Sequence, residues 1–100
     1  MMRRVVREFD ESSNIQFLKD NYPDNVYAEG FDNAIIGYDA SSGQAIYDYD
    51  ICVKILMSEN ISYEDAVEHM EYNVIGTKGL DNAPIFMHIL SYEKSVKHLV

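Results

Sequence analysis

The fold is decided by residues 34–57, which read AIIGYD-ASSG-QAIYD-YDICVKILM. The first and third blocks are short runs rich in β-branched and aromatic residues. The block between them ends in Gly43, which can adopt the positive φ of a short hairpin loop. From Tyr49 the apolar residues change to helical spacing, at Cys52, Val53, Ile55, Leu56 and Met57. The stretch therefore predicts a β-hairpin followed directly by a helix that ends near Asn60.

A second helix and a third strand are predicted after this stretch. Ser62 can cap the helix, with Asp65 in the place of the Glu or Gln of a capping box, and the helix should end near Gly76. Residues 77–83 then form a loop, and Pro84 leads a strand over residues 84–90, where the missing N–H matters least. The inner face of the helix would comprise Ala66, Val67, Met70 and Val74.

Shorter helices are predicted near both ends. Ser12-Ser13-Asn14 would cap a helix over residues 15–19, which the turn-forming residues 21–25 stop. Ser91 would cap a last helix, or the tail carries no regular structure. We therefore expect one α+β domain over residues 1–100, in which a small antiparallel sheet, the hairpin plus a third strand, packs against a helical pair. Its core should contain Ile36, Ile46, Val53, Leu56, Val67, Met70 and Phe86.

Composition limits what such a domain can do. The 100 residues include 17 acidic and 8 basic side chains, a formal net charge of −9, and 47% are hydrophobic. A chain of this size buries about two-thirds of its unfolded surface, which excludes a large multi-step enzyme. No apolar run approaches the roughly 20 residues that span a bilayer, and an acidic chain is unsuited to binding phosphates. We expect no membrane and no direct nucleic-acid partner.

Cysteine usage indicates the compartment. Cys52 is the single cysteine, and Arg3, Arg4 and Arg7 are not followed by the apolar stretch of a secretory or twin-arginine signal. The expected location is the cytoplasm.

The negative charge is concentrated in the middle of the chain. Residues 8–76 hold 15 acidic residues against Lys19 and Lys54, a net charge of −13, whereas residues 1–7 carry +3. A solvated surface explains this distribution, and so does an acidic face that recognises a basic partner.

Motifs for nucleophilic catalysis are weak. Cys52 could pair with His69, His88 or His98, but it lies on the apolar stripe of its helix, in the most acidic part of the chain. A reactive thiolate needs an electropositive, partly exposed setting, so a small buried hydrophobe is the better interpretation. No catalytic residue is predicted.

Metal and phosphate motifs are also missing from the pattern. A metal site could draw on acidic residues and a histidine, but no ligand pair has the spacing of a known metal motif, and the glycines match no phosphate-binding loop. We predict no metal and no cofactor. The residues that such a metal site could use are Asp48, Asp50, Glu68, His69 and Glu71.

Tyrosines adjoin acidic residues throughout the sequence. Tyrosine supplies rigid amphipathic contact area, and carboxylates steer a basic partner toward the surface. Many of these rings must be core in a small domain, while others should reach the surface. The predicted binding residues are Tyr38, Asp39, Tyr47, Asp48, Tyr49, Asp50, Glu64, Glu68, Glu71 and Tyr72.

Residues 31–87 resemble a set of small proteins encoded by tailed bacteriophages. The resemblance rests on Ile36-Gly37-Tyr38-Asp39, on Glu71-Tyr72-Asn73 followed by Gly76, and on Pro84-Ile85-Phe86. It implies a phage origin and carries no established reaction.

Two classes of function follow. The first is an acidic protein-binding module, a phage accessory or anti-defence protein that occupies a basic surface of a host protein in the host cytoplasm. The alternative is a small metal-assisted enzyme or ligand-binding domain that uses clustered carboxylates and tyrosines. A structural role in the virion, or as a homodimer, is a third option.

Overall fold

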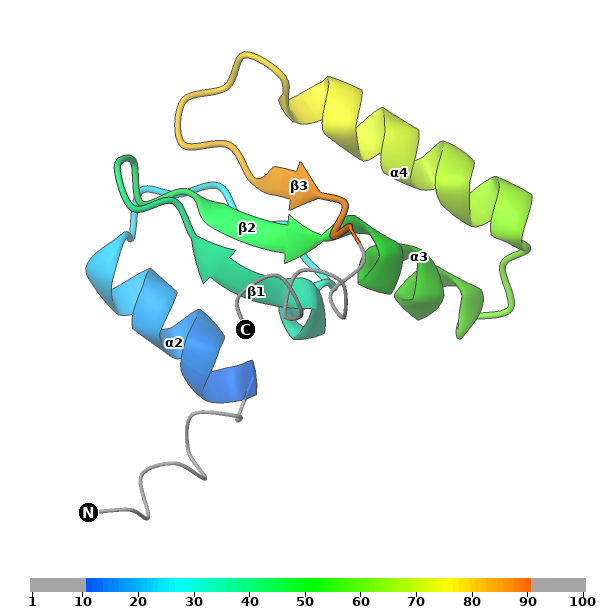
Figure 1. Ribbon diagram of the computed structural model, residues 1–100, viewed down its shortest axis with the longest axis horizontal. Coiled ribbons are helices and arrows are strands. Elements are labelled where there is room, and N and C mark those ends of the chain that lie inside the picture. The colour runs from blue at the N-terminus through cyan, green and yellow to red at the C-terminus, as the bar shows by residue number, and fades with distance from the viewer. Residues whose placement is uncertain (1–10, 91–100) are drawn as a thin grey trace, which may run out of the picture.

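The computed structural model describes residues 11–90, with side chains from Asn14 onward, and confirms the α+β class (Figure 1). The helix expected from Ser91 and the arginines of residues 1–7 lie outside the described residues. The elements, in chain order, are α2 (Glu11–Asn21), the 3-10 helix η1 (Asp32–Ala34), β1 (Ile35–Tyr38), β2 (Ala45–Asp48), α3 (Tyr49–Met57), α4 (Tyr63–Thr77) and β3 (Ile85–Met87).

The expected hairpin is formed by β1 and β2, which pair antiparallel with a bulge between Ile35 and Gly37. Its loop is held by the Asp39 carboxylate, which accepts hydrogen bonds from the backbone N–H groups of Ser41 and Ser42. Gly43 has a φ of +80°, and a Cβ there would collide with the Tyr22 ring. This position therefore requires glycine twice over, for its dihedral angle and for space.

The third strand differs from the antiparallel sheet that we expected, because β3 pairs with β2 in parallel. In this register Tyr47 lies beside Phe86, and Asp48 lies beside Met87. Neighbouring parallel strands need a long crossover connection, which α3 and α4 supply between the end of β2 and the start of β3. Both strands consequently end at the same edge of the sheet, close to the start of α3.

A side chain caps the first turn of α3 and of α4. The Ser62 hydroxyl accepts from the Asp65 backbone N–H at 3.1 Å, which confirms the expected cap of α4. At α3 the cap is Asp48, whose Oδ1 accepts from the N–H groups of Asp50 at 2.9 Å and Ile51 at 3.2 Å. Both helices therefore begin where a side chain satisfies their first N–H groups.

The first described helix is longer than residues 15–19. It begins at Glu11, so residues 12–14 lie within the helix and do not cap it. Leu18 is 2% exposed, and α2 packs against η1 and β1. Leu18 thus anchors this helix on the core of the domain.

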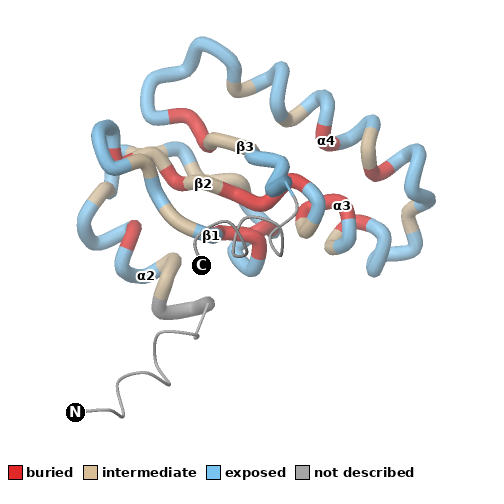
Figure 2. Tube along the Cα trace, in the orientation of Figure 1, coloured by how far each residue is buried: buried red, intermediate tan, exposed pale blue. Residues whose placement is uncertain are grey.

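The core forms where the hairpin, α3 and the buried side of α4 meet, as Figure 2 shows along β2 and α3. Val53, Leu56 and Met70 are buried as expected, and Val67 and Phe86 pack against them partly buried. Ile46 is half-buried.

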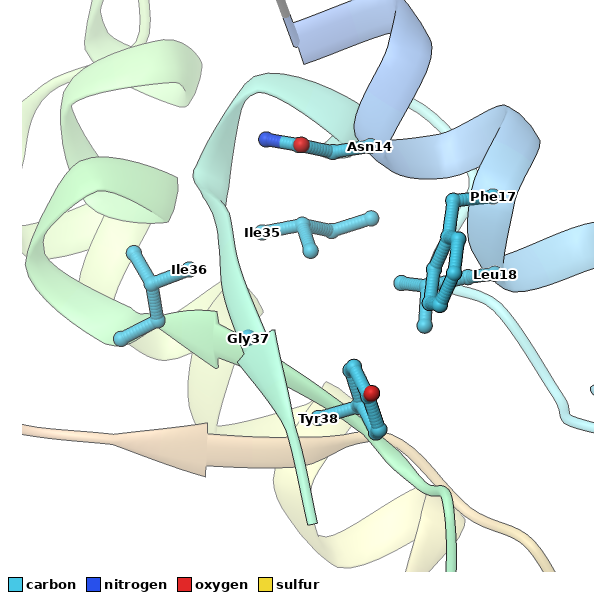
Figure 3. A pocket seen from close by; sticks show the side chains of 7 residues that line it. All are labelled: Asn14, Phe17, Leu18, Ile35, Ile36, Gly37 and Tyr38. Atoms are coloured by element: carbon cyan, nitrogen blue, oxygen red, sulfur yellow. The ribbon is translucent and has the colours of Figure 1, made fainter. Parts of the chain in front are cut away.

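The placement of Ile36 in the core was wrong, since this side chain is 42% exposed. Figure 3 shows the Ile36 side chain on one side of β1 and the side chains of Ile35 and Tyr38 on the other. Ile35 is buried in the core, and neighbouring residues of a strand point to opposite faces, so Ile36 lies on the outer face of β1.

Candidate functional site

A groove of about 590 Å³ lies between α3 and α4 and reaches the residue that follows β3. Apolar side chains of both helices contribute to its lining, among them the buried Val53 and the half-buried Val67. The complete lining is Tyr49, Asp50, Val53, Lys54, Met57, Tyr63, Val67, Glu71 and His88. The groove thus combines apolar and aromatic surface with acidic and basic groups from three parts of the chain.

Two contacts connect the polar groups of the groove. The Tyr49 hydroxyl donates to Glu71 Oε2 at 3.5 Å, which joins the two helices. His88 Nδ1 lies 3.5 Å from Asp50 Oδ1, and both side chains are more than 60% exposed. The rings of Tyr49 and His88 are tilted against each other with centroids 4.3 Å apart. Tyr49 is buried at 8% exposure, whereas Asp50, Glu71 and His88 are exposed, so the contacts hold the charged groups weakly at the surface of the groove.

Helical and strand geometry explain why these residues meet. Tyr63, Val67 and Glu71 follow one another at four-residue spacing and so share one face of α4. Because β2 and β3 are parallel and Asp48 lies beside Met87, the next residues along each chain, Tyr49 and His88, also come together. The crossover connection through α3 and α4, with the parallel pairing of β3, therefore brings the lining residues of the groove together.

The phenol of Tyr49 stays protonated in this environment. Burial raises its pKa above the usual value, and the Glu71 carboxylate adds to that effect. A protonated Tyr49 hydroxyl is able to donate to Glu71, in agreement with the contact between them.

The structure brings three of the predicted binding residues together in the groove: Tyr49, Asp50 and Glu71. Three more, Glu64, Glu68 and Tyr72, are exposed on the adjoining stripe of α4, where Tyr72 is 73% exposed. These two stripes of one helix form a surface that is continuous along α4.

Two predicted binding residues have structural positions instead. Tyr47 is fully buried, with its ring centroid 5.4 Å from that of Phe86, and its hydroxyl oxygen accepts the Ala28 backbone N–H at 2.9 Å. Asp48 is 9% exposed and caps α3. The alternation of β2 turns Tyr47 toward the core, and the start of α3 draws in Asp48, so neither offers a surface to a partner.

The remaining two predicted residues lie at the hairpin. Asp39 holds the loop, and its hydrogen bonds with Ser42 and Ser41 lower the pKa of its carboxyl group. Tyr38 lines a second, smaller pocket of about 160 Å³ between α2 and β1 (Figure 3). Its other lining residues are Asn14, Phe17, Leu18, Ile35, Ile36 and Gly37.

Cys52 is fully buried, in agreement with the apolar stripe on which it lies. Burial, together with the Asp48 charge, raises the pKa of its thiol to about 12. The thiol is therefore protonated at neutral pH. Within residues 11–90 no three His, Cys, Asp or Glu side chains are grouped so as to hold a metal ion.

Several residues that complete the groove were not among the predicted binding residues, chiefly Lys54, Tyr63 and His88. The signal for Tyr63 was available in its four- and eight-residue spacing to Val67 and Glu71. The signal for His88 was hidden, because an antiparallel third strand would not carry it to the start of α3.

In the described part of the chain, no helix is both long and apolar enough to cross a membrane. No protein-family model, curated protein or solved structure matches the sequence or fold of this chain.

Proposed function

We propose that this protein is an acidic protein-binding module that occupies a basic surface of a partner protein. In the setting implied by the phage resemblance, the partner is a host or defence protein of the bacterial cytoplasm, and binding blocks that protein's own contacts. The module would use the groove between α3 and α4 together with the exposed stripe of α4.

The groove is the observation that carries this proposal. It places Asp50 and Glu71 on opposing helices around accessible apolar and aromatic surface. Charged groups accelerate the encounter with an oppositely charged surface, whereas buried aromatic and apolar contacts slow its dissociation. A site with both features fits a protein partner of basic character.

Capture from bacterial extract tests the proposal if the baits are matched in charge. One bait is the wild type, and a second carries Asp50→Asn with Glu71→Gln in the groove. A third carries Glu29→Gln with Asp81→Asn, two exposed acids that do not line the groove. The second and third baits have equal net charge.

We expect the wild type and the third bait to recover the same protein at low salt, and the groove variant to lose it. Recovery should fall at high salt, because exposed charges are screened beyond about 8 Å at physiological ionic strength. Equal recovery by all three baits would contradict the groove as the binding site.

A second candidate function is supported by the pair of Asp50 and His88, whose imidazole lies beside the Tyr49 ring. A carboxylate, an imidazole and a phenol around a concave site are groups that can bind a small ligand and move protons.

Thermal melting with and without excess Mg²⁺, Mn²⁺ or Zn²⁺ separates the metal-assisted form of this candidate from the first. A ligand bound only by the native state at 100 times its Kd adds about 2.7 kcal/mol to the free energy of unfolding. A rise of several degrees in Tm would favour the small-ligand candidate, and an unchanged Tm is the result that we expect.

A further inference from the structure

We propose that the groove between α3 and α4 binds an arginine side chain presented by the partner. This inference rests on the proposed function, because it names the side chain through which the basic surface is recognised. It depends on how the carboxylates, the rings and the apolar residues of the groove are arranged.

The carboxylates come from opposite helices and retain hydrogen-bonding capacity. Glu71 is contacted through Oε2 by the Tyr49 hydroxyl, and Asp50 is contacted through Oδ1 by His88. Among residues 11–90, no hydrogen bond or ion pair engages the second oxygen of either group. A guanidinium group has five N–H donors in a planar fork, so it can pair with one carboxylate and still donate to a neighbouring acceptor.

Aromatic and apolar surface adjoins those oxygens. Tyr63 lines the groove and is 59% exposed, whereas the Tyr49 ring is 8% exposed and packs against His88, so Tyr63 offers the open aromatic face. A guanidinium stacks on aromatic faces and is weakly hydrated, whereas an ammonium is a compact, strongly hydrated charge. The methylene stem of arginine can lie along Val53 and Val67 while its head stays polar.

Lys54 sets where the cation can lie. It follows Asp50 by one helical turn on α3 and lines the same groove. Its positive charge opposes a guanidinium near α3 and favours one near Glu71 on α4. Glu71 is therefore the principal acceptor, and neutralising Lys54 should tighten binding.

The volume of the groove also fits this ligand. At about 590 Å³ it exceeds the size of one side chain, so it can admit an arginine together with its neighbouring backbone. The smaller pocket beside β1, at about 160 Å³, has no acidic lining residue. A third pocket, at about 210 Å³, is lined by one acid, Asp24, and it too is much smaller than the groove. Among these three sites the groove alone combines two acidic residues with room for a side chain and its backbone.

NMR titration of the ¹⁵N-labelled full chain tests the inference, with blocked tripeptides as probes. The peptides are acetyl-Gly-Arg-Gly-amide, the lysine analogue and the citrulline analogue, which has nearly the shape of arginine without its charge. We expect the arginine peptide to shift the amide signals of groove residues such as Val53, Val67 and Glu71. The lysine peptide should bind several-fold more weakly, and the citrulline peptide should cause no shift.

Matched variants complete the test. Glu71→Gln should weaken the arginine peptide several-fold, Lys54→Gln should strengthen it, and Glu29→Gln should leave it unchanged, each with a native-like amide spectrum. Equal binding of the arginine, lysine and citrulline peptides, shifts confined to another surface, or an unaffected Glu71→Gln variant would overturn the inference.

This outcome is separable from that of the proposed function. If the charge-matched baits show a groove-dependent partner while arginine and lysine peptides bind alike, the arginine inference fails and the proposed function stands. If the groove variants also leave partner capture unchanged, both fail.

Discussion

The groove between α3 and α4 and the pocket between α2 and β1 differ in what tyrosine does in each. In the pocket between α2 and β1, the ring of Tyr38 is tilted against that of Phe17 with centroids 5.7 Å apart, and no charged side chain lines the space (Figure 3). Outside the pocket lining, the Tyr22 ring is also tilted against Tyr38, with centroids 5.4 Å apart. In the groove between α3 and α4, Tyr49 contacts a carboxylate and an imidazole. Tyrosine thus stabilises one end of the domain, while at the other end it is part of a polar site.

The difference separates stability from binding. The pocket by β1 is built from side chains that contact one another, so changes there should affect folding. The charged groups of the groove are exposed or make long contacts, so changes there should affect binding and leave folding largely intact.

The largest effect should come from the core that both regions share. Leu56 in α3 is 6% exposed, and Leu18 in α2, which lines the β1 pocket, is 2% exposed. Leu56→Ala should lower the free energy of unfolding by about 2 to 5 kcal/mol, because the removed side chain leaves a cavity.

Chemical denaturation followed by circular dichroism and by tyrosine fluorescence measures this loss, with Leu18→Ala as the matched variant. Both variants should unfold in one transition that the two probes report together. A loss below about 1 kcal/mol for Leu56→Ala would place α3 outside the common core.

Alkaline pH should have the next largest effect, through Tyr47, which is fully buried between the two regions. Burial raises its pKa from 10.0 to about 12, with the Asp32 charge adding to the shift. The unfolded chain loses this proton first, so the stabilisation is complete below pH 10 and disappears as the pH rises toward 12. The loss should be roughly 2 to 3 kcal/mol.

Urea unfolding at several pH values between 8 and 12 measures this slope, which Cys52 should steepen because its thiol pKa is also raised to about 12. Tyr47→Phe is the control. It should start about 1 to 3 kcal/mol less stable, since the Ala28 N–H loses its acceptor, and should show a shallower alkaline slope. An unchanged slope would contradict the assignment to Tyr47.

A smaller effect should distinguish two neighbouring acids at the start of α3. Asp48 caps the helix, whereas Asp50 is exposed at the groove. Asp48→Ala should cost about 0.5 to 2 kcal/mol of folding free energy, with Asp48→Asn costing less. Asp50→Asn should leave stability within about 0.5 kcal/mol of the wild type. Thermal melting of the three variants measures the contrast, and equal losses at both positions would remove the separation of roles.

Much of the fold was predictable because the signals were local. The hairpin loop at Gly43, the cap at Ser62 and the helical stripe containing Leu56 are each set by residues close in sequence. The direction of β3 was not, since it depends on how α3 and α4 pack and therefore on contacts between residues far apart. The exposure of Ile36 likewise follows from which face of β1 the core covers, since the neighbouring Ile35 occupies the buried face.

The site was predictable only in its chemistry. Clustered tyrosines and carboxylates directed attention to Tyr49, Asp50 and Glu71, which the structure does bring together. The same composition also selected Tyr47 and Asp48, because a sequence shows that a tyrosine adjoins an acid and does not show which of them faces the core. His88 entered the groove through the parallel register, which no local pattern indicated.

The most direct measurement is the association rate of the captured partner with two variants of equal net charge. One carries Asp50→Asn with Glu71→Gln, and the other carries Glu29→Gln with Asp81→Asn. In surface-based binding kinetics, the association rate of the wild type should fall steeply as the salt concentration rises. At low salt the groove variant should associate more slowly than its charge-matched counterpart while keeping the same melting temperature. Equal rates for the two variants, or a wild-type rate that ignores salt, would contradict recognition of a basic partner by this groove.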